Sequence, residues 1–242
     1  GSSKYDTFSD PKLVSSSLTW ETIATTNLGL DLGFLQNTLN VSFDWFQREN
    51  KNMIAPGKAL PSVIGATSAY ENAGSMRTRG WELTIDWRDT FGDWTVYATA
   101  NLSDYKTIIT QWDSQNLLNQ NYTGKEYGEI WGFETDRYFT KEDFVYDDQG
   151  VVTGYANGIA SQKSLESGKF VYGVGDVKFV DQNGDGVIDA GDGTPENHGD
   201  LIKIGNTTPR FNYSLRAGFD YNINKGKGGN LDFDLYFQGV GK

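Results

Sequence analysis

The chain has 242 residues, among them 13 Tyr, 14 Phe and 7 Trp, with no cysteine, one histidine and a formal net charge of −11. The acidic balance argues against nucleic acid as a partner, and the lack of cysteine excludes disulfide and thiolate chemistry. No apolar run is long enough for a transmembrane helix, whereas a mean hydropathy of −0.53 is compatible with a membrane β-barrel, whose strands are apolar only at alternate positions.

Alternation of apolar and polar residues is the dominant pattern along the chain. It predicts strands with one apolar face in NLGLDLGF, LNVSFDWF, WELTIDW, WTVYATANL, FNYSLRAGFDYNI and LDFDLYF, at residues 27–34, 39–46, 81–87, 94–102, 211–223 and 231–237. Two further strands are predicted near GEIWGFETD and GDVKFV, at residues 128–136 and 175–180. The sequence therefore predicts an all-β fold whose main strands are about 9–12 residues long, the length that crosses a membrane at a tilt.

The connections between these strands alternate in length. Residues 35–38, 89–93 and 224–230 form short connections rich in turn residues, whereas residues 50–76 and 104–205 form long ones. In a meander all short turns lie at one end, and short periplasmic turns with long extracellular loops are typical of outer-membrane barrels. Aromatic residues near strand ends are expected to form a girdle at the membrane surface: Trp45, Trp87, Trp94 and Tyr221.

These patterns favour an antiparallel transmembrane β-barrel segment with long extracellular loops. The final strand has no returning partner, and an unpaired edge is unfavourable in lipid, so we expect the whole chain, residues 1–242, to form part of a larger barrel. The alternative is a secreted, calcium-stabilised β-sandwich that binds glycan or serves in adhesion. Detergent dependence would distinguish the two.

Residues 181–192, DQNGDGVIDAGD, match the spacing of a calcium-binding loop within the 104–205 region. The predicted ligands at loop positions 1, 3, 5, 7, 9 and 12 are Asp181, Asn183, Asp185, Val187 through its carbonyl, Asp189 and Asp192. Gly186 occupies the sixth position, where a sharp turn is needed, and Asp192 departs from the Glu of an EF-hand. The alternative is a metal-free turn. We favour calcium in a structural role.

Other candidate residues carry weaker signals. Aromatic residues of the loop region could stack on sugar rings, although packing of the loop against itself is the commoner role: Trp112, Tyr122, Tyr127, Trp131, Phe133, Tyr138 and Tyr155. Polar-face residues would line a barrel lumen or pair with one another: Asp31, Asp44, Glu82, Asp86, Arg88 and Arg216. His198, the only histidine, is expected to be a solvated loop residue, and no catalytic constellation is found, so an enzyme is not expected.

Several stretches resemble a known family. SLTWETIATTNLGLDLGFLQNTLNVSFDWFQRENKNMI, ENAGSMRTRGWELTIDWRD, YGEIWGFETDRYF, DVKFVDQNGDGVID and IGNTTPRFNYSL are similar to the later barrel region of SusC-like TonB-dependent transporters, without a plug domain. The resemblance implies a barrel of about 22 strands in the bacterial outer membrane, a SusD-like surface lipoprotein as partner, and coupling to the TonB complex through other parts of the protein. It further implies import of glycans or oligosaccharides, with this chain as part of the barrel wall in contact with membrane lipid. The sequence does not specify which glycan or peptide is imported, or which residues bind it.

Overall fold

The computed structural model describes residue 15 and residues 18–57, 69–113, 116–223 and 228–241. The chain forms two compact units. The sheet unit comprises residues 1–114, 123–127 and 208–242, and the loop unit comprises residues 115–122 and 128–207. Among these described residues the elements are strands and two short 3-10 helices, so the predicted all-β fold is confirmed.

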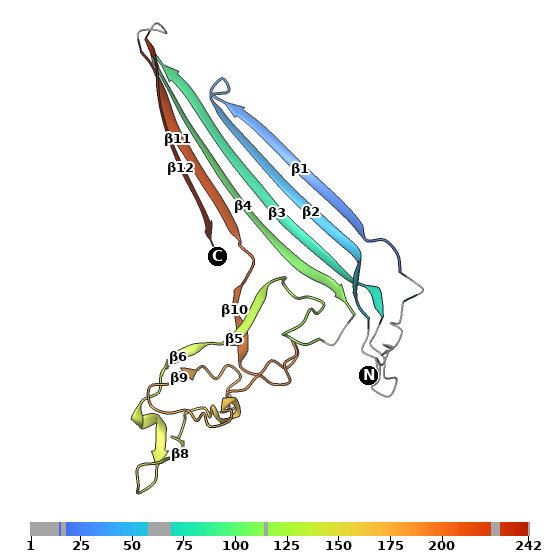
Figure 1. Cartoon of the computed structure of the whole chain (residues 1–242), viewed down its shortest axis with the longest axis vertical. Coiled ribbons are helices and arrows are strands. Elements are labelled where there is room, and N and C mark those ends of the chain that lie inside the picture. The colour runs from blue at the N-terminus through green and yellow to red at the C-terminus, as the bar shows by residue number, and fades with distance from the viewer. Residues whose placement is uncertain (1–14, 16–17, 58–68, 114–115, 224–227, 242) are drawn as a thin grey trace, which may run out of the picture. The chain divides into compact units, whose positions relative to one another are not determined.

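The sheet unit is a single antiparallel sheet of six strands in the order β1-β2-β3-β4-β11-β12 (Figure 1). Its strands are β1 (Thr22–Phe34), β2 (Leu39–Pro56), β3 (Tyr70–Phe91), β4 (Trp94–Trp112), β11 (Phe211–Ile223) and β12 (Gly229–Gly241). Within this unit each strand pairs with the next one along the chain, which is the meander that the sequence predicts. The six described strands form part of a barrel rather than a closed one.

β11 has the predicted bounds, 211–223, whereas the other five strands of the sheet are longer than the alternation predicts, and the six strands have 13 to 22 residues. The alternating pattern stops early because the outward positions become polar before the strands end. On β2 Trp45 is followed by Gln47 and Glu49 in regular register, and on β3 Trp81 is preceded by Arg79 and Arg77. Bulges interrupt the register only further along, between Asn50 and Ile54 and at Ser75 and Met76.

The connections differ in extent from the predicted ones. Residues 35–38 form a tight turn in which Leu35, Gln36 and Asn37 have φ of 51°, 59° and 66°, and the β3–β4 turn has Gly92 at φ 64°. Between β2 and β3 the connection is reduced to residues 57–69, of which 58–68 lie outside the described residues. The connection between β4 and β11 runs over residues 113–210, rather than 104–205. Of the predicted 224–230 turn, residues 224–227 lie outside the described residues.

One face of the sheet is apolar and exposed. The register brings the apolar positions of all six strands to this face, for example in the row Leu30, Phe43, Leu83, Leu102 and Tyr213. Leu30, Phe233 and Phe237 are 55%, 52% and 56% exposed, whereas the core of buried apolar residues contains none of them. An apolar face of this extent is far beyond what a soluble protein leaves in water, and it identifies the lipid-facing side of a membrane barrel.

The apolar face has an edge that crosses several strands. On β3 the outward positions are apolar from Trp81 to Phe91, with the exception of Asp89, and beyond Trp81 they become charged at Arg79 and Arg77. The apolar stretch is close to the 9–11 residues that a tilted strand needs to cross the hydrocarbon core. Trp45 lies directly opposite Trp81 in the register, so two indole rings mark this edge.

At the turn end of the sheet Trp94 contacts Tyr221, with ring centroids 4.4 Å apart. Trp45, Trp94 and Tyr221 thus lie near the ends of the apolar stretch, as a girdle requires. Trp87, in contrast, lies inside the stretch, opposite Leu39 and Ala98.

The loop unit is built from short paired strands around a small core. β5 (Glu129–Phe133) pairs with β10 (Leu201–Asn206), β6 (Thr135–Tyr138) with β9 (Val177–Phe179), and β7 (Phe144–Tyr146) with β8 (Val152–Tyr155), and the 3-10 helices are Lys141–Asp143 and Lys163–Leu165. The predicted strands near residues 128–136 and 175–180 therefore exist, but in two-stranded sheets. Phe139 is buried among aromatic rings, in contact with Phe144, Tyr155 and Tyr172.

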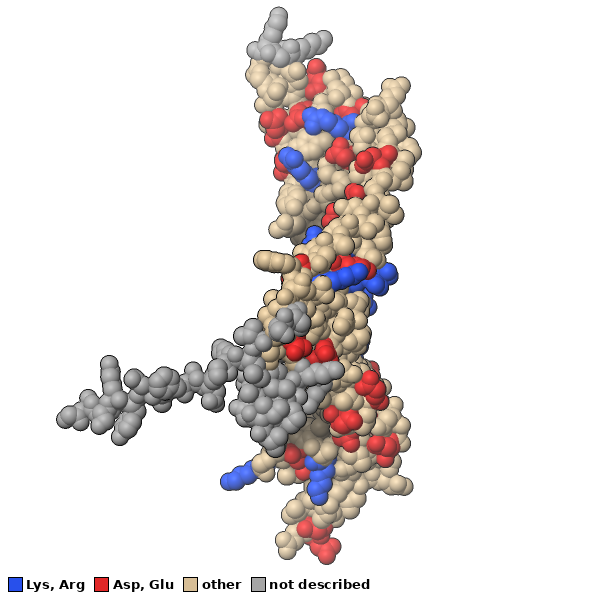
Figure 2. All heavy atoms as spheres, turned by 90° about the vertical axis from the view of Figure 1, so that its right-hand side faces the viewer, with Lys and Arg blue, Asp and Glu red and all other residues tan. Residues whose placement is uncertain are grey.

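The sandwich alternative requires a second sheet over the apolar face. Each of the other described sheets has two strands, so none matches the six-stranded sheet as a second layer. The described residues also contain no helix long and apolar enough to cross a membrane. Charged side chains form clusters separated by broad uncharged areas on the face shown in Figure 2.

Candidate functional site

The polar face of the sheet carries a network of paired charges near the short turns. Arg88 forms an ion pair with Asp220 at 3.1 Å, and Arg216 binds Asp234 through Nε and a terminal nitrogen at 2.8–3.1 Å. The guanidinium groups of Arg88 and Arg216 lie 5.4 and 5.5 Å from the ring of Tyr97. Of the predicted polar-face residues, Arg88 and Arg216 are therefore paired within the sheet, and Asp86 accepts a hydrogen bond from the Thr99 hydroxyl at 2.6 Å.

Asp31, Asp44 and Glu82 have no cationic partner among the described residues. Asp44 lies directly opposite Glu82 in the register of β2 with β3, and its carboxylate occupies the space beside Gly29. Asp44 and Glu82 are both exposed on the polar face. Two carboxylates in register repel one another, so this part of the face is acidic and uncompensated within the sheet.

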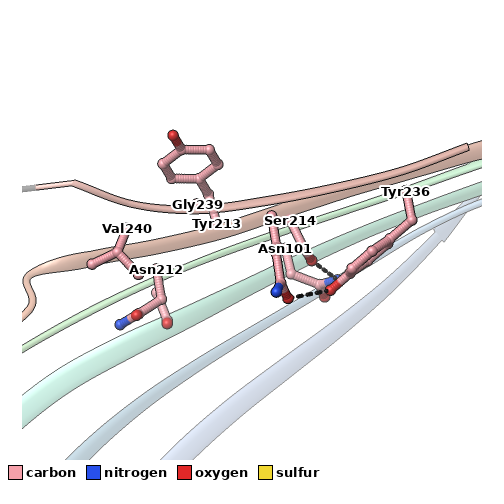
Figure 3. Close-up of a pocket in the computed structure, with 9 residues that line it drawn as sticks. Asn101, Asn212, Tyr213, Ser214, Tyr236, Gly239 and Val240 are labelled. Carbon is pink, nitrogen blue, oxygen red and sulfur yellow. Dashed lines mark hydrogen bonds between the residues drawn. The ribbon is translucent and has the colours of Figure 1, made fainter.

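A hollow of about 480 Å³ lies on the sheet beside this network, and uncharged side chains line it (Figure 3). Its polar lining is Asn101, Ser103, Asn212, Ser214, Tyr236 and Gln238. Asn101 is held in place because its amide nitrogen donates to the Ser214 hydroxyl at 3.1 Å and its amide oxygen accepts from Thr84 at 2.9 Å. Tyr213 points to the opposite side of the sheet from Asn101 and Ser214 in Figure 3.

The charges near the hollow are partly neutralised. Arg216 is paired with Asp234 at 2.8 Å, whereas Glu82, opposite the lining residue Ser103, has no cationic partner among the described residues. The polar side chains that line the hollow are themselves amide and hydroxyl groups without charge. Its size falls in the range of small-molecule sites, and its groups suit a ligand with several hydroxyl or amide groups.

The predicted calcium loop is held by hydrogen bonds of its own acidic residues to the backbone. Asp181 accepts from the Gly184 and Gly186 amides at 2.7 and 2.9 Å, and Asp185 accepts from the Val187 amide at 2.8 Å. Gly184 and Gly186 have φ of 76° and 85°, which explains why glycine stands there. A carboxylate has about four lone-pair sites, so these bonds leave acceptor capacity for a metal ion.

The later part of the loop fits the predicted ligand set less well. Asp192 accepts from the amide and hydroxyl of Thr194 at 3.1 and 2.6 Å, and this bonding lowers the pKa of its carboxyl group. Asp189 accepts from the Gly191 amide at 2.7 Å. Among the described residues no three acidic or histidine side chains are gathered as metal ligands would be. The ligand set Asp181, Asn183, Asp185, Val187, Asp189 and Asp192 stays a prediction, and the Asp192 carboxylate is hydrogen-bonded to Thr194.

Sequence analysis did not identify Asp200, which holds the loop at residues 181–192 through hydrogen bonds to its backbone. It is fully buried and accepts from the Gln182 amide at 2.7 Å and the Asp189 amide at 2.9 Å. Its own amide donates to the Asp189 carbonyl at 2.8 Å. Asp200 lies beyond the predicted loop, at no spacing that a calcium motif defines, so only the fold could identify it.

Most of the candidate sugar-stacking aromatics pack within the protein. Trp112 covers Gly74 in the sheet unit, Phe133 contacts Phe179 at 5.3 Å between ring centroids, and Tyr155 belongs to the Phe139 cluster. Tyr127 and Tyr138 are the two exposed ones, at 52% and 68%.

Around Glu129 the remaining aromatics form a buried cluster. Tyr122 and Trp131 both donate to the Glu129 carboxylate, which also pairs with Lys203 at 2.7 Å. Burial and the hydrogen bond to Glu129 raise the pKa of Tyr122. His198 is half-buried against Trp131, at 5.3 Å between ring centroids, rather than solvated.

The exposed apolar face, the meander and the polar opposite face together define a segment of a transmembrane β-barrel wall. The family model of the TonB dependent receptor-like β-barrel matches residues 3–242, and the chain belongs to this family of outer-membrane β-barrel receptors, which are not enzymes. The predicted resemblance to SusC-like receptors is confirmed by the named relatives below.

Several curated receptors are similar to the chain. TonB-dependent receptor P39 of Formosa agariphila is 27% identical over 236 residues, covering 89% of this chain and 22% of that protein. TonB-dependent receptor SusC of Bacteroides thetaiotaomicron is 29% identical over 205 residues, covering 79% of this chain and 18% of that protein. The chain thus spans about a fifth of the length of the curated relatives it matches.

Among solved structures, the RagAB peptide transporter aligns with a TM-score of 0.53 at 20% identity, covering 90% of this chain and 21% of that one. The RagAB peptide importer in its open-open state aligns with a TM-score of 0.51 at 21% identity. These similarities support the fold alone.

Proposed function

We propose that the chain forms part of the wall of an outer-membrane importer that takes up glycans or oligosaccharides with energy from the TonB complex. The observation that carries this proposal is the exposed apolar face, backed by a polar face of paired charges. Membership in the receptor family supports the transport class.

The connection between β4 and β11 lies at the end opposite the short turns. In such barrels the long connections face outward from the cell. We therefore place the loop unit outside the cell, where it would meet a SusD-like lipoprotein. Support for that partner comes from the similarity to SusC.

For the substrate, the uncharged hollow on the polar face favours a neutral, hydroxyl-rich molecule. Asn101, Ser214 and Gln238 offer donors and acceptors, Tyr236 offers an exposed ring face, and the nearby Arg216 is paired with Asp234. A peptide is the second candidate, because a solved structure of similar fold is titled a peptide transporter.

An uptake experiment separates these candidates. Cells that express or lack the receptor are supplied with a neutral oligosaccharide such as maltoheptaose or xylohexaose, the anionic oligomer hexagalacturonate, or hexaalanine, with and without an ionophore that collapses the proton gradient. We expect receptor-dependent, ionophore-sensitive uptake of a neutral oligosaccharide. Asn101→Asp should reduce it, and Asn27→Asp, the same change on the polar face of β1, should not. Uptake of the peptide alone would refute the glycan assignment.

We also propose that residues 181–192 bind calcium in a structural role. The turn geometry at Gly184 and Gly186 and the spare acceptor capacity of Asp181, Asn183 and Asp185 support this proposal. A bound ion would fix the loop and neutralise part of its charge. Asp200 would orient the same backbone from behind through its hydrogen bonds to Gln182 and Asp189.

A further inference from the structure

A row of polar and basic side chains lies just beyond the apolar edge, on the lipid-facing side of the sheet. Gln47, Arg79 and Lys106 stand opposite one another on β2, β3 and β4. Arg79 has the same parity on β3 as Trp81, two residues away, so its side chain leaves the sheet on the same face. Its hydrogen bond to Gln47, which has the parity of Trp45, confirms the shared face.

The charges in this row are incompletely compensated. Lys106 pairs with Glu126 at 2.5 Å, whereas Arg79 donates its Nε to the neutral Gln47 amide oxygen at 2.7 Å. Arg79 is exposed and has no carboxylate partner among the described residues. Two cations opposite each other on neighbouring strands repel, so an anion that lies between Arg79 and Lys106 would relieve this repulsion.

The next row adds to the positive potential. Arg77 binds Glu49 at 2.9 Å, and Lys51 shares the same carboxylate at 3.3 Å. Two cations therefore share one anion there, and Arg77 and Lys51 are 40% and 58% exposed. The basic patch is formed by Arg77, Arg79, Lys51 and Lys106. Together with Arg210, which pairs with Asp104 and Glu126, it keeps a positive excess over the carboxylates Glu49, Glu126 and Asp104.

The distance of Arg79 from the apolar edge, measured along the membrane normal, indicates what kind of anion it binds. Two residues of strand rise about 7 Å, or about 5 Å along the membrane normal for a strand tilted by about 45°. The headgroup region extends about 5–7 Å beyond the hydrocarbon core on each side. The free donors of Arg79 therefore lie at the level of lipid phosphates.

We propose that Arg79 and Lys106 bind the phosphate group of a membrane lipid headgroup, with Arg77 and Lys51 supplying further positive potential. The free terminal nitrogens of Arg79 offer the planar fork that binds phosphate oxygens in pairs, and the adjacent Trp45 and Trp81 rings pack beside the upper acyl chain. The site would fix the height of the wall in the membrane. The assignment of this site to the outer leaflet of the membrane rests on the proposed function.

The test measures lipid preference of the purified receptor in nanodiscs. Phosphatidic acid, which carries a phosphate monoester, and phosphatidylcholine are each supplied with brominated acyl chains, and quenching of tryptophan fluorescence reports which lipid lies next to the protein. We expect phosphatidic acid to be favoured about fivefold or more. Arg79→Gln should remove most of this preference, and Arg79→Lys should retain part of it. Arg88→Gln, which alters an arginine on the polar face, should leave it intact.

Each other outcome overturns the proposal. Equal quenching by both lipids, or an unchanged preference in Arg79→Gln with an unchanged urea midpoint, would show that Arg79 binds no lipid phosphate. Loss of the preference in saturating inorganic phosphate would identify free phosphate as the occupant instead. Because the experiment involves no transport, failure here leaves the import proposal standing, and failure of uptake leaves a measured lipid preference standing.

Discussion

The sheet unit and the loop unit place their apolar side chains in opposite ways. In the sheet, Leu30 and Phe237 are 55% and 56% exposed, whereas Phe139 in the loop unit is 1% exposed. The sheet is organised for a lipid environment, in which apolar groups face outward and charges pair on the other side. The loop unit is organised as a small water-soluble domain, with aromatic residues inside. The two units of the chain therefore suit different environments, lipid for the apolar face of the sheet unit and water for the loop unit.

The largest expected effect tests the core of the loop unit. Phe139→Ala should cost about 3–5 kcal/mol of local stability, because it leaves a cavity among Phe144, Tyr155 and Tyr172. Amide hydrogen exchange of the loop unit in the intact receptor measures this cost. Tyr138→Ala, at a neighbouring residue that is 68% exposed, is the matched control and should change the exchange little. Similar effects of both substitutions would remove the contrast between the units.

A charge on the apolar face of the sheet comes next. Ile85→Arg should cost about 2–4 kcal/mol of the free energy of unfolding in lipid vesicles, measured by urea titration with tryptophan fluorescence. Glu82→Arg is a control on the same strand, because Glu82 lies on the polar face opposite Asp44. It should be neutral or stabilising. If Ile85→Arg were tolerated as well, the exposed apolar face would not be facing lipid.

The Arg137–Asp143 pair tests how the loop unit responds to pH. The two terminal guanidinium nitrogens of Arg137 donate to the two Asp143 oxygens at 2.6 Å, and this bonding holds the pKa of the buried Asp143 well below its usual range. A lowered pKa in the folded state means that the stabilisation is complete above about pH 4 and is lost as pH falls further. Asp143→Asn should cost about 2 kcal/mol at pH 7, by proteolysis rate, with a smaller difference from wild type at pH 3. A difference that stayed constant with pH would contradict the assignment.

Calcium should have a smaller effect on the loop unit. For a site of millimolar affinity, a tenfold excess of Ca²⁺ over the dissociation constant stabilises the folded state by about 1.4 kcal/mol. The measurement is protection of residues 181–192 from hydrogen exchange with Ca²⁺ or with a chelator. Asp185→Asn should abolish the calcium effect, and Asp148→Asn, an acidic residue of another turn, should preserve it. If Ca²⁺ gives wild type no protection, the loop is a metal-free turn.

The smallest effect belongs to the exposed ion pairs on the polar face. Arg88→Gln should change the unfolding free energy by less than about 1 kcal/mol, because Arg88 is 59% exposed where it meets Asp220. A double-mutant cycle with Asp220→Asn measures the coupling. A coupling well above this value would mean that the polar face is shielded from water in the assembled barrel.

Much of the sheet could be predicted from alternation alone, because every second side chain in a strand points to the same face. The predicted strands ended too early at Phe46 and Trp81, because the outward positions beyond them, such as Gln47 and Arg79, are polar while the pairing continues. The calcium-type spacing at residues 181–192 stays a prediction, and in the structure the Asp192 carboxylate accepts a hydrogen bond from the Thr194 hydroxyl. Spacing along the chain specifies possible ligands, and the direction of each side chain depends on the competing donors nearby.

What the sequence by itself determined is the class: paired strands with one apolar face, in a chain that belongs to the TonB-dependent receptor barrels. Only the tertiary structure decided which residues share a level of the sheet. The register sets Trp45 beside Trp81 and Arg79 beside Lys106, and the fold buries Asp200 behind the loop at residues 181–192. Residues that are neighbours across strands are separated by long and variable stretches of chain. A local sequence pattern therefore predicts which face of the sheet a side chain occupies, but not which residues lie opposite it.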